Sequence, residues 1–233
     1  MKVRILIKVT IFQIYQFSLK HIWSLFGVIL LLPICFVIFF NFYNPSKSFY
    51  INSEIKRLGK IKQEWVDIEK LPKVVSRSAV AAEDANFCTH HGFDIDAIFA
   101  VIKSGANRGA STISQQVAKN VFLWHGRNYL RKGLEVGFTV LIELIWSKKR
   151  ILEVYLNVAE FDEGVFGVSA AAQNYFKIDI KNITSLQAAR LMAILPNPKN
   201  RSASKPNNFV RKKTKRIMSG AETILKDGRT SCF

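Results

Sequence analysis

The longest uninterrupted apolar stretch of the chain predicts a membrane-spanning helix. Residues 22–43 contain no charged side chain, and a run of this length is enough to cross a bilayer as a helix. A cleaved signal peptide is the alternative, but the run is too long and no A-x-A-like site follows it, which favours a retained anchor. Basic residues precede and follow the run, so charge bias alone does not decide the topology.

Beyond this run, apolar residues recur mainly with helical spacing. Residues 54–71 predict an amphipathic helix near the membrane, and residues 72–84, which start with a proline and are rich in Ala and Val, predict a buried helix. Thr112 and Gln115 fit a capping box at the start of a helix over 112–123. Further helices are expected over 128–146, 147–161, 169–176 and 185–195. Because alternating strand patterns are scarce, the predicted fold is mostly α.

These elements divide the chain into five expected segments. They are a short basic segment over 1–21, the transmembrane helix over 22–43, a linker over 44–53, a globular domain over 54–200 and a basic segment over 201–233. The last segment is expected to be a loosely ordered tail, either solvated or held on an anionic membrane surface. The glycine-containing stretch 105–111 is expected to be a flexible loop.

Composition adds an unusual combination of charge and hydrophobicity. The formal net charge is +17, while 49% of the residues are hydrophobic. Disordered basic tails lack such apolar content, and ordinary soluble enzymes lack such charge. A fixed anionic partner is therefore indicated, namely nucleic acid, anionic lipid or a phosphorylated substrate.

The three cysteines do not form an obvious framework. Cys35 lies in the predicted span, Cys88 lies between Phe87 and His90, and Cys232 is near the end of the sequence. A Cys88–Cys232 disulfide is one interpretation, but independent thiols are favoured.

The stretch AVAAEDANFCTHHGFDIDAI, residues 79–98, ends a predicted helix with the adjacent carboxylates Glu83 and Asp84. Alone, they fit a surface helix end, a metal site or an acid/base pair. His90 and His91 give little support for metal, because adjacent residues on a helix do not face one another and no third ligand is suitably spaced. His90 is expected to pack or hydrogen-bond. Glu143, inside an apolar helix, is expected to be a buried structural carboxylate with a partner.

Basic residues are concentrated between positions 103 and 150. Nine Lys and Arg residues stand there against Glu135 and Glu143. A solvated basic face is the simplest interpretation. However, a helix that starts after a glycine loop, at Ser111 and Thr112, also offers free N–H groups to an anion. Cations that could add charge-assisted hydrogen bonds to phosphate are Lys119, Arg127, Arg131 and Lys132.

One carboxylate beside a basic pocket suits glycosyl transfer from a diphosphate. The diphosphate is a good leaving group that needs cations more than an acid, whereas an acceptor hydroxyl needs one positioned base. Two carboxylates without the cations would suit hydrolysis better.

Five ordered motifs then resemble those of the peptidoglycan glycosyltransferases of family 51. EDANFCTHHG is similar to their E-D-x-x-F-x-x-H-x-G, and GASTISQQ to G-x-S-T-I-[TS]-Q-Q. RKGLE is similar to R-K-x-x-E, ILEVYLN to I-L-E-x-Y-L-N, and GVFGVSAAAQNYF to the fifth block. With no transpeptidase domain following, the chain most resembles the monofunctional biosynthetic transglycosylases. The resemblance implies a lysozyme-like α lobe with a small jaw lobe. One departure is Lys177, which stands where a glycine is common.

The resemblance also implies roles for individual residues. Glu83 is the catalytic base, and Glu135 is a second essential carboxylate that organises the diphosphate or a cation. Asp84 and His90 shape the substrate site. The positions implied to hold the donor's diphosphate, or to lie near it, are Ser111, Gln116, Lys119, Arg127, Arg131 and Lys132. No cofactor is required, and a divalent cation (Mg²⁺ or Mn²⁺) assisting the diphosphate is left open.

The implied reaction is polymerisation of lipid II into β-1,4-linked glycan strands, with release of undecaprenyl diphosphate, for cell-wall synthesis. Implied partners are lipid II, the growing glycan, the membrane and proteins of cell-wall synthesis or division, without nucleic acid. The catalytic domain is expected outside the cytoplasm, tethered to the inner (plasma) membrane by a single span. Two alternatives stay open: a lysozyme-like glycan hydrolase, and a non-catalytic membrane-tethered binder of anionic polymer.

Overall fold

The computed structural model describes residues 20–21, 23–24, 27–28, 31–105, 111–126 and 128–233. The chain forms two compact units, Met1–Phe42 and Tyr43–Phe233. In the first unit residues 31–42 are helical. Across the described residues, none of the helices combines the length and apolar character needed to cross a membrane. Part of the predicted span 22–43 lies outside the described residues, so that span stays a prediction.

The second unit is mostly helical, which confirms the predicted class. Its elements in chain order are α2 (Phe49–Leu58), β1 (Lys62–Gln63), η1 (Ile68–Lys70), α3 (Lys73–Glu83), α4 (Ile95–Ser104), α5 (Ile113–Phe122), α6 (Tyr129–Ile145), α7 (Lys148–Val158), β2 (Glu160–Asp162), β3 (Val165–Phe166), α8 (Val168–Phe176), η2 (Ile180–Asn182), α9 (Ser185–Ile194), η3 (Pro198–Asn200) and α10 (Asn208–Lys226). The predicted helices over 72–84, 112–123, 128–146, 147–161, 169–176 and 185–195 all have counterparts, but the one predicted over 147–161 ends earlier, at Val158, because Glu160–Asp162 form β2.

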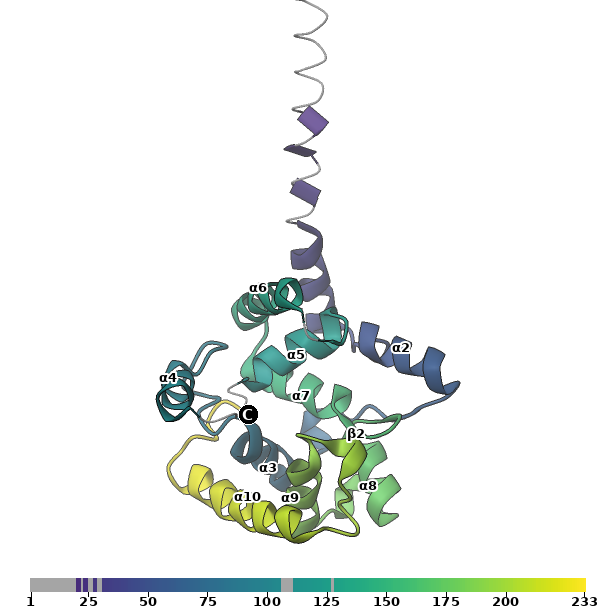
Figure 1. The fold of residues 1–233 in the computed structure, drawn as a ribbon, viewed down its shortest axis with the longest axis vertical. Helices are drawn as coiled ribbons and strands as arrows, with labels where there is room; N and C mark the ends of the chain where they lie inside the picture. Colours follow the sequence, from purple (N-terminus) through teal and green to yellow (C-terminus); the bar gives the residue numbers. More distant parts are fainter. Residues whose placement is uncertain (1–19, 22, 25–26, 29–30, 106–110, 127) are drawn as a thin grey trace, which may run out of the picture. The chain divides into compact units, whose positions relative to one another are not determined.

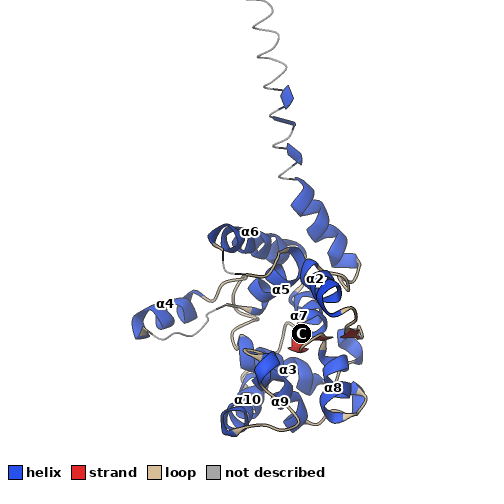
Figure 2. Ribbon diagram, turned by 45° about the vertical axis from the view of Figure 1, so that its right-hand side comes forward, coloured by secondary structure: helices blue, strands red, loops and turns tan. Residues whose placement is uncertain are grey.

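Two groups of helices enclose a buried central helix (Figures 1 and 2). The helices α3, α9 and α10 pack together, and α5 packs against both α6 and α7. Helix α7 lies between these groups, and it is buried along most of its length, including Ile151, Leu152 and Tyr155. Helix α4 stands to one side in both views.

A small sheet of order β1-β3-β2 combines β1, which precedes α3, with β2 and β3, which follow α7. Strand β1 pairs with β3 in parallel, joining Lys62 to Val165, and β2 pairs with β3 in antiparallel orientation. Gly167 ends β3 at φ 81°, and a Cβ there would lie 3.0 Å from the Asn157 carbonyl oxygen. Glycine is therefore required where the chain turns from the sheet into α8.

The predicted helix over 54–71 is wrong in its bounds. Helix α2 starts earlier, where Ser48 caps it by accepting a hydrogen bond from the Ile51 N–H, and it ends at Leu58 because Gly59 takes φ 77°. The remaining residues of the predicted helix form β1 and η1 instead.

The loosely ordered tail expected over 201–233 is also wrong. Residues Asn208–Lys226 form α10, and Asn207 caps its start by accepting a hydrogen bond from the Val210 N–H. The buried face of α10 carries Val210, Thr214, Ile217 and Ile224. Basic side chains occupy other positions of this helix, so the high charge of the segment hid an amphipathic pattern.

Candidate active site

Glu83 occupies the last position of α3 and is held there from two other helices. Its Oε2 atom accepts a hydrogen bond from the Gln116 Nε2 atom of α5 at 3.0 Å. Its Oε1 atom lies 3.9 Å from the Lys213 Nζ atom of α10. The Glu83 side chain keeps 13% of its surface exposed, so this carboxylate is both oriented and accessible to a substrate.

A cavity of about 800 Å³ opens on one side of Glu83. Its polar lining comes from the ends of α3 and α5 and from the segment that includes α10. The cationic side chains in the lining are Lys119, Arg201, Lys212, Lys213 and Arg216, and Ser111 and Gln116 are there as well. So many cations around one carboxylate make this cavity suited to a multiply charged anion.

Burial lowers the pKa of two of these cations. Desolvation lowers the pKa of Lys119, with Arg131 and Lys132 adding to the effect while Glu135 and Glu83 oppose it. Desolvation likewise lowers the pKa of Lys213, and Glu83 opposes it. Both ammonium groups are therefore poorly solvated, and a bound anion would replace the lost hydration.

A second cavity, of about 350 Å³, is lined in part by the same residues. It shares Glu83 and Ser111 with the first cavity, and Asp84, Asn86, Asp94 and Thr112 supply further polar lining. Its described lining contains neither Lys nor Arg. Glu83 therefore lines both a cationic cavity and a second cavity that suits an uncharged polar group such as a sugar.

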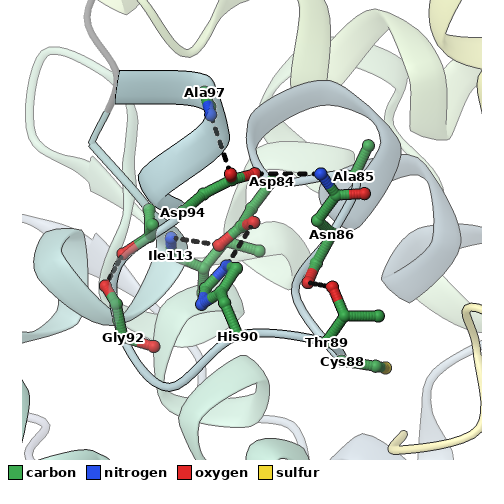
Figure 3. Close-up of polar contacts among 12 residues, drawn as sticks. Asp84, Ala85, Asn86, Cys88, Thr89, His90, Gly92, Asp94, Ala97 and Ile113 are labelled. Carbon is green, nitrogen blue, oxygen red and sulfur yellow. Dashed lines mark hydrogen bonds and ion pairs between the residues drawn. The ribbon is translucent and has the colours of Figure 1, made fainter. Parts of the chain in front are cut away.

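Asp84 links the residues around the end of α3 to the start of α5 (Figure 3). Its Oδ1 atom lies 2.8 Å from the His90 Nε2 atom, and its Oδ2 atom accepts a hydrogen bond from the Ile113 N–H at 3.0 Å. Ile113 is the first residue of α5, so the carboxylate satisfies a free helix N–H group. Asp84 and His90 thereby fix the end of α3 to the start of α5, and the predicted hydrogen-bonding role of His90 is confirmed.

The start of α5 is set by local chemistry that the sequence predicted. The Thr112 side chain accepts from the Gln115 N–H, and the Gln115 side chain accepts from the Thr112 N–H, which completes the capping box. Thr112 Oγ1 also donates to the Gly92 carbonyl at 2.6 Å. This cap orients the first turn of α5, where Gln116 reaches Glu83.

Glu135 lies on α6 and pairs with two cationic side chains of the same helix. Its carboxylate is buried and lies 2.8 Å from the Arg131 Nη1 atom and 2.5 Å from the Lys132 Nζ atom. These three residues do not belong to the described lining of either cavity. Glu135 does favour the charged form of Lys119, which connects it to the cationic cavity electrostatically.

Glu143 is a structural carboxylate. Its side chain is only 6% exposed, accepts a hydrogen bond from the Ser114 hydroxyl and pairs with the Lys148 Nζ atom at 2.8 Å, so the expected paired structural carboxylate is confirmed.

The remaining predictions concern Arg127, the loop and metal binding. Arg127 and most of the expected loop over 105–111 lie outside the described residues. In the part of the chain that is described, His, Cys, Asp and Glu do not gather into a group of three that could hold a metal ion.

The expectation of independent thiols at Cys88 and Cys232 is wrong. The two residues form a disulfide, with their Cα atoms 5.6 Å apart, and they are 144 positions apart in the sequence. Helix α10 packs along α3, and this return of the chain brings Cys232 back to the loop that follows Glu83. Sequence spacing alone could not reveal the pair.

The sequence analysis missed the site residues contributed by the last part of the chain. Arg201, Lys212, Lys213 and Arg216 line the cationic cavity, although their segment was expected to be a tail. The signal that could have found them is the apolar spacing Val210, Thr214 and Ile217, which is helical and predicts a packed face.

Comparisons with known proteins agree with this geometry. A family model described as Transglycosylase matches residues 52–222. The biosynthetic peptidoglycan transglycosylase of Jannaschia sp. (strain CCS1) is 50% identical over 186 residues, covering 80% of this chain and 78% of the relative. That of Caulobacter vibrioides is 42% identical over 213 residues, covering 90% of this chain and 93% of the relative. A glutamate held at the edge of a cationic cavity, within a matched region that includes most of α10, is thus found in a chain that belongs to the transglycosylase family.

Proposed function

We propose that this protein is a peptidoglycan glycosyltransferase that polymerises lipid II into β-1,4-linked glycan strands for cell-wall synthesis. The name of the curated relatives supports the peptidoglycan substrate. The observation that carries the mechanism is that Glu83 lines both the cationic cavity and the second cavity, which is named the cation-free cavity because its described lining contains neither Lys nor Arg.

The cationic cavity would take the diphosphate of the donor, which is the lipid-linked end of the growing strand. Lys119, Lys213 and Arg216 can neutralise the diphosphate, and Ser111 and Gln116 can donate hydrogen bonds to it. These contacts stabilise the charge that builds up on the leaving group as its bond to the sugar breaks. Arg127 is assigned to the same group by its motif alone.

The second cavity would take the acceptor, the N-acetylglucosamine end of lipid II. Glu83 removes the proton from its 4-hydroxyl, and that oxygen forms a bond to the anomeric carbon of the donor's N-acetylmuramic acid. The bond from this carbon to the diphosphate oxygen breaks, and undecaprenyl diphosphate leaves with the electron pair. Attack from the face opposite the leaving group inverts an α-linked diphosphate to a β-1,4 bond.

Glu135 would act through the cations beside it. It fixes Arg131 and Lys132 and favours the charged form of Lys119. We assign it to organising the diphosphate side of the site, while Asp84 and His90 position Glu83. A divalent cation, Mg²⁺ or Mn²⁺, would assist the diphosphate without being required, and the substrate's own phosphate oxygens would supply its ligands.

A membrane location is supported by three features. The predicted span over 22–43 would anchor the chain, and α4 exposes Ile95, Phe99 and Ile102 to the surroundings. The substrate's lipid tail stays in the bilayer, so the site must work beside it. The disulfide between Cys88 and Cys232 supports an extracytoplasmic catalytic domain, because the cytosol keeps thiols reduced. We therefore assign the protein to the inner (plasma) membrane, single-pass, with a lysozyme-like lobe and a smaller jaw lobe outside.

A glycan hydrolase is less well supported. Hydrolysis with two acidic groups requires a second carboxylate facing the scissile bond, but Asp84 is bound to His90 and to the Ile113 N–H. A non-catalytic binder of anionic polymer gives no reason for a glutamate that lines both cavities.

The deciding experiment is lipid II polymerisation by the detergent-solubilised full chain beside its Glu83→Gln variant. We expect glycan strands and undecaprenyl diphosphate from the wild type and neither from the variant. Glu222→Gln, which changes an exposed carboxylate of α10, is the matched control and should polymerise normally. Full polymerisation by Glu83→Gln would refute the assignment of the base. An inactive, folded wild type with intact lipid II would refute the function, and glycan release from purified sacculi would favour the hydrolase.

A further inference from the structure

The chain after α10 is covalently bonded to the loop that follows α3, the helix that ends at Glu83. We use the term clasp for residues 227–233 and rim loop for residues 85–88. Cys232 of the clasp is disulfide-bonded to Cys88 of the rim loop. The Arg229 Nη1 atom donates to the Ala85 carbonyl oxygen and lies 3.3 Å from the Asn86 Oδ1 atom. The Phe233 ring lies 6.5 Å from the Phe87 ring. Three different kinds of contact therefore join the same two segments.

The rim loop forms part of the wall of the cation-free cavity. Ala85 and Asn86 line that cavity beside Glu83. Asn86 Nδ2 donates to Asp94 Oδ2 at 3.0 Å, and the other oxygen of Asp94 accepts from the Ala97 N–H at the start of α4 (Figure 3). Asp94 and Ala97 line the same cavity. The position of Asn86 thus sets the geometry of one whole side of the cavity.

Apart from the clasp, the rim loop is held by the fully buried Phe87 side chain and by the hydrogen bond from Asn86 to Asp94. Its described backbone hydrogen bonds are local, from the Phe87 N–H to Asp84 and from the Thr89 N–H to Asn86. Local turns fix the shape of a loop but leave its lateral position to outside contacts. Lys148 stacks over the Phe87 ring at 4.5 Å, and the clasp supplies the contacts to Ala85, Asn86 and Cys88.

The clasp does not reach the cationic cavity directly. Lys213, which approaches Glu83, lies 13 residues before Lys226, the last residue of α10. At about 1.5 Å per residue this is about 20 Å along the helix. A change in the clasp should therefore alter the geometry of the cation-free cavity more than that of the cationic cavity.

We propose that the clasp positions the acceptor wall of the active site, with Arg229 as a positioning residue and the Cys88–Cys232 disulfide as its fastening. This inference rests on the proposed function, in which the cation-free cavity holds the acceptor. Loosening the clasp weakens acceptor binding and leaves donor binding and the base unchanged.

The test separates the two substrates kinetically. A preformed lipid-linked glycan strand serves as donor and lipid II as acceptor, and each is varied while the other is saturating. For Arg229→Ala we expect the KM for lipid II to rise about fivefold, with the KM for the donor strand within twofold of the wild type. Arg229→Lys, which keeps one donor for the Ala85 carbonyl, should recover part of the loss. Lys226→Ala removes a nearby exposed positive charge and should behave as the wild type.

The disulfide is tested in parallel. A double variant, Cys88→Ser with Cys232→Ser, should show the same selective rise in the acceptor KM. Treating the wild type with a thiol reductant should reproduce that rise, while the double variant should not respond to it. Circular dichroism and Tm are measured for each protein, and Arg229→Ala, which keeps the disulfide, decides the matter if the double variant does not fold.

Two outcomes would overturn the proposal. An unchanged acceptor KM in folded Arg229→Ala would show that the clasp does not position the acceptor wall. An equal rise in both KM values, following the loss in Tm, would show general destabilisation instead. Wild-type polymerisation is measured first, so inactivity of the wild type counts against the proposed function, whereas activity with unselective variants counts against the clasp alone.

Discussion

The Gln116 Nε2 atom donates a hydrogen bond to the Glu83 Oε2 atom at 3.0 Å, which links the first turn of α5 to the last residue of α3. Gln116 lines the cationic cavity together with Glu83. An amide at this position orients the carboxylate without adding charge. A second carboxylate in its place would compete with Glu83 for a proton.

Gln116→Glu should therefore move the acidic limb of the pH–rate profile for polymerisation to higher pH by about one unit. Two carboxylates in contact share a proton, so a higher pH is needed before Glu83 can accept the proton of the acceptor hydroxyl. Gln116→Leu removes the hydrogen bond without adding charge, and its rate should fall while the limb stays in place. An acidic limb that does not move in Gln116→Glu would contradict the role of Glu83 as base.

Lys119→Met should stabilise the folded protein while removing activity. Burial lowers the pKa of Lys119 in the folded state, so the unfolded chain binds its proton more tightly. The cost of burying the charged group is present below the lowered pKa and is relieved as pH rises toward 10.5, the ordinary value. We expect the free energy of unfolding at pH 7 to rise by about 1 kcal/mol and polymerisation to fall by about a hundredfold.

Urea denaturation of wild type and Lys119→Met at pH 7 and pH 10 measures this directly. The stability gain should be smaller at pH 10 than at pH 7, because the lowered pKa lets Lys119 lose its proton more readily in the folded state than in the unfolded chain. A variant that is less stable than the wild type at pH 7 would show that Lys119 contributes to the stability of the folded protein, which contradicts the prediction.

Glu135→Gln and Glu143→Gln form a matched pair. Both glutamates are on α6, both side chains are buried, and both pair with cations. Each variant should lose about 2–3 kcal/mol of stability, because a buried cation is left without its counter-charge. Only Glu135→Gln should abolish lipid II polymerisation. Equal activity losses in the two variants would remove the case for a special role of Glu135.

Lys177→Gly should stabilise the protein without affecting activity. Lys177 follows α8 with φ 59°, and it is the only non-glycine residue with positive φ among the described residues. Side chains strain the backbone there, so glycine should add about 0.5–1 kcal/mol to the free energy of unfolding after its own entropy cost. Urea denaturation checks this, with Lys177→Ala as a control that keeps the strain and should show little gain.

Local features of the site could be predicted from the sequence. The cap of α5 depends on Thr112 and Gln115, three positions apart, so the spacing alone determines it. The helix ending at Glu83 was predicted from its small apolar residues, and the structure has it as α3. The pairing of Glu135 with Arg131 and Lys132 also follows from helical spacing, since residues three and four apart share a face.

Features that depend on distant contacts could not be predicted in this way. Lys213 reaches Glu83 only because α10 packs against α3 and α9. Its own neighbours are mostly basic, which favours a solvated segment when packing is not considered. Cys88 and Cys232 likewise meet only after this packing is in place.

The disulfide has a consequence for how the protein is made. Its two cysteines are 144 positions apart, and ribosomes add about 5–20 residues per second. Cys88 therefore emerges as a free thiol roughly 7–30 s before its partner is synthesised. During that interval the nascent chain depends on thiol chemistry in its surroundings to avoid mispairing. Oxidative or reductive stress during synthesis should therefore lower the yield of correctly bonded enzyme before it changes the rate of any finished molecule.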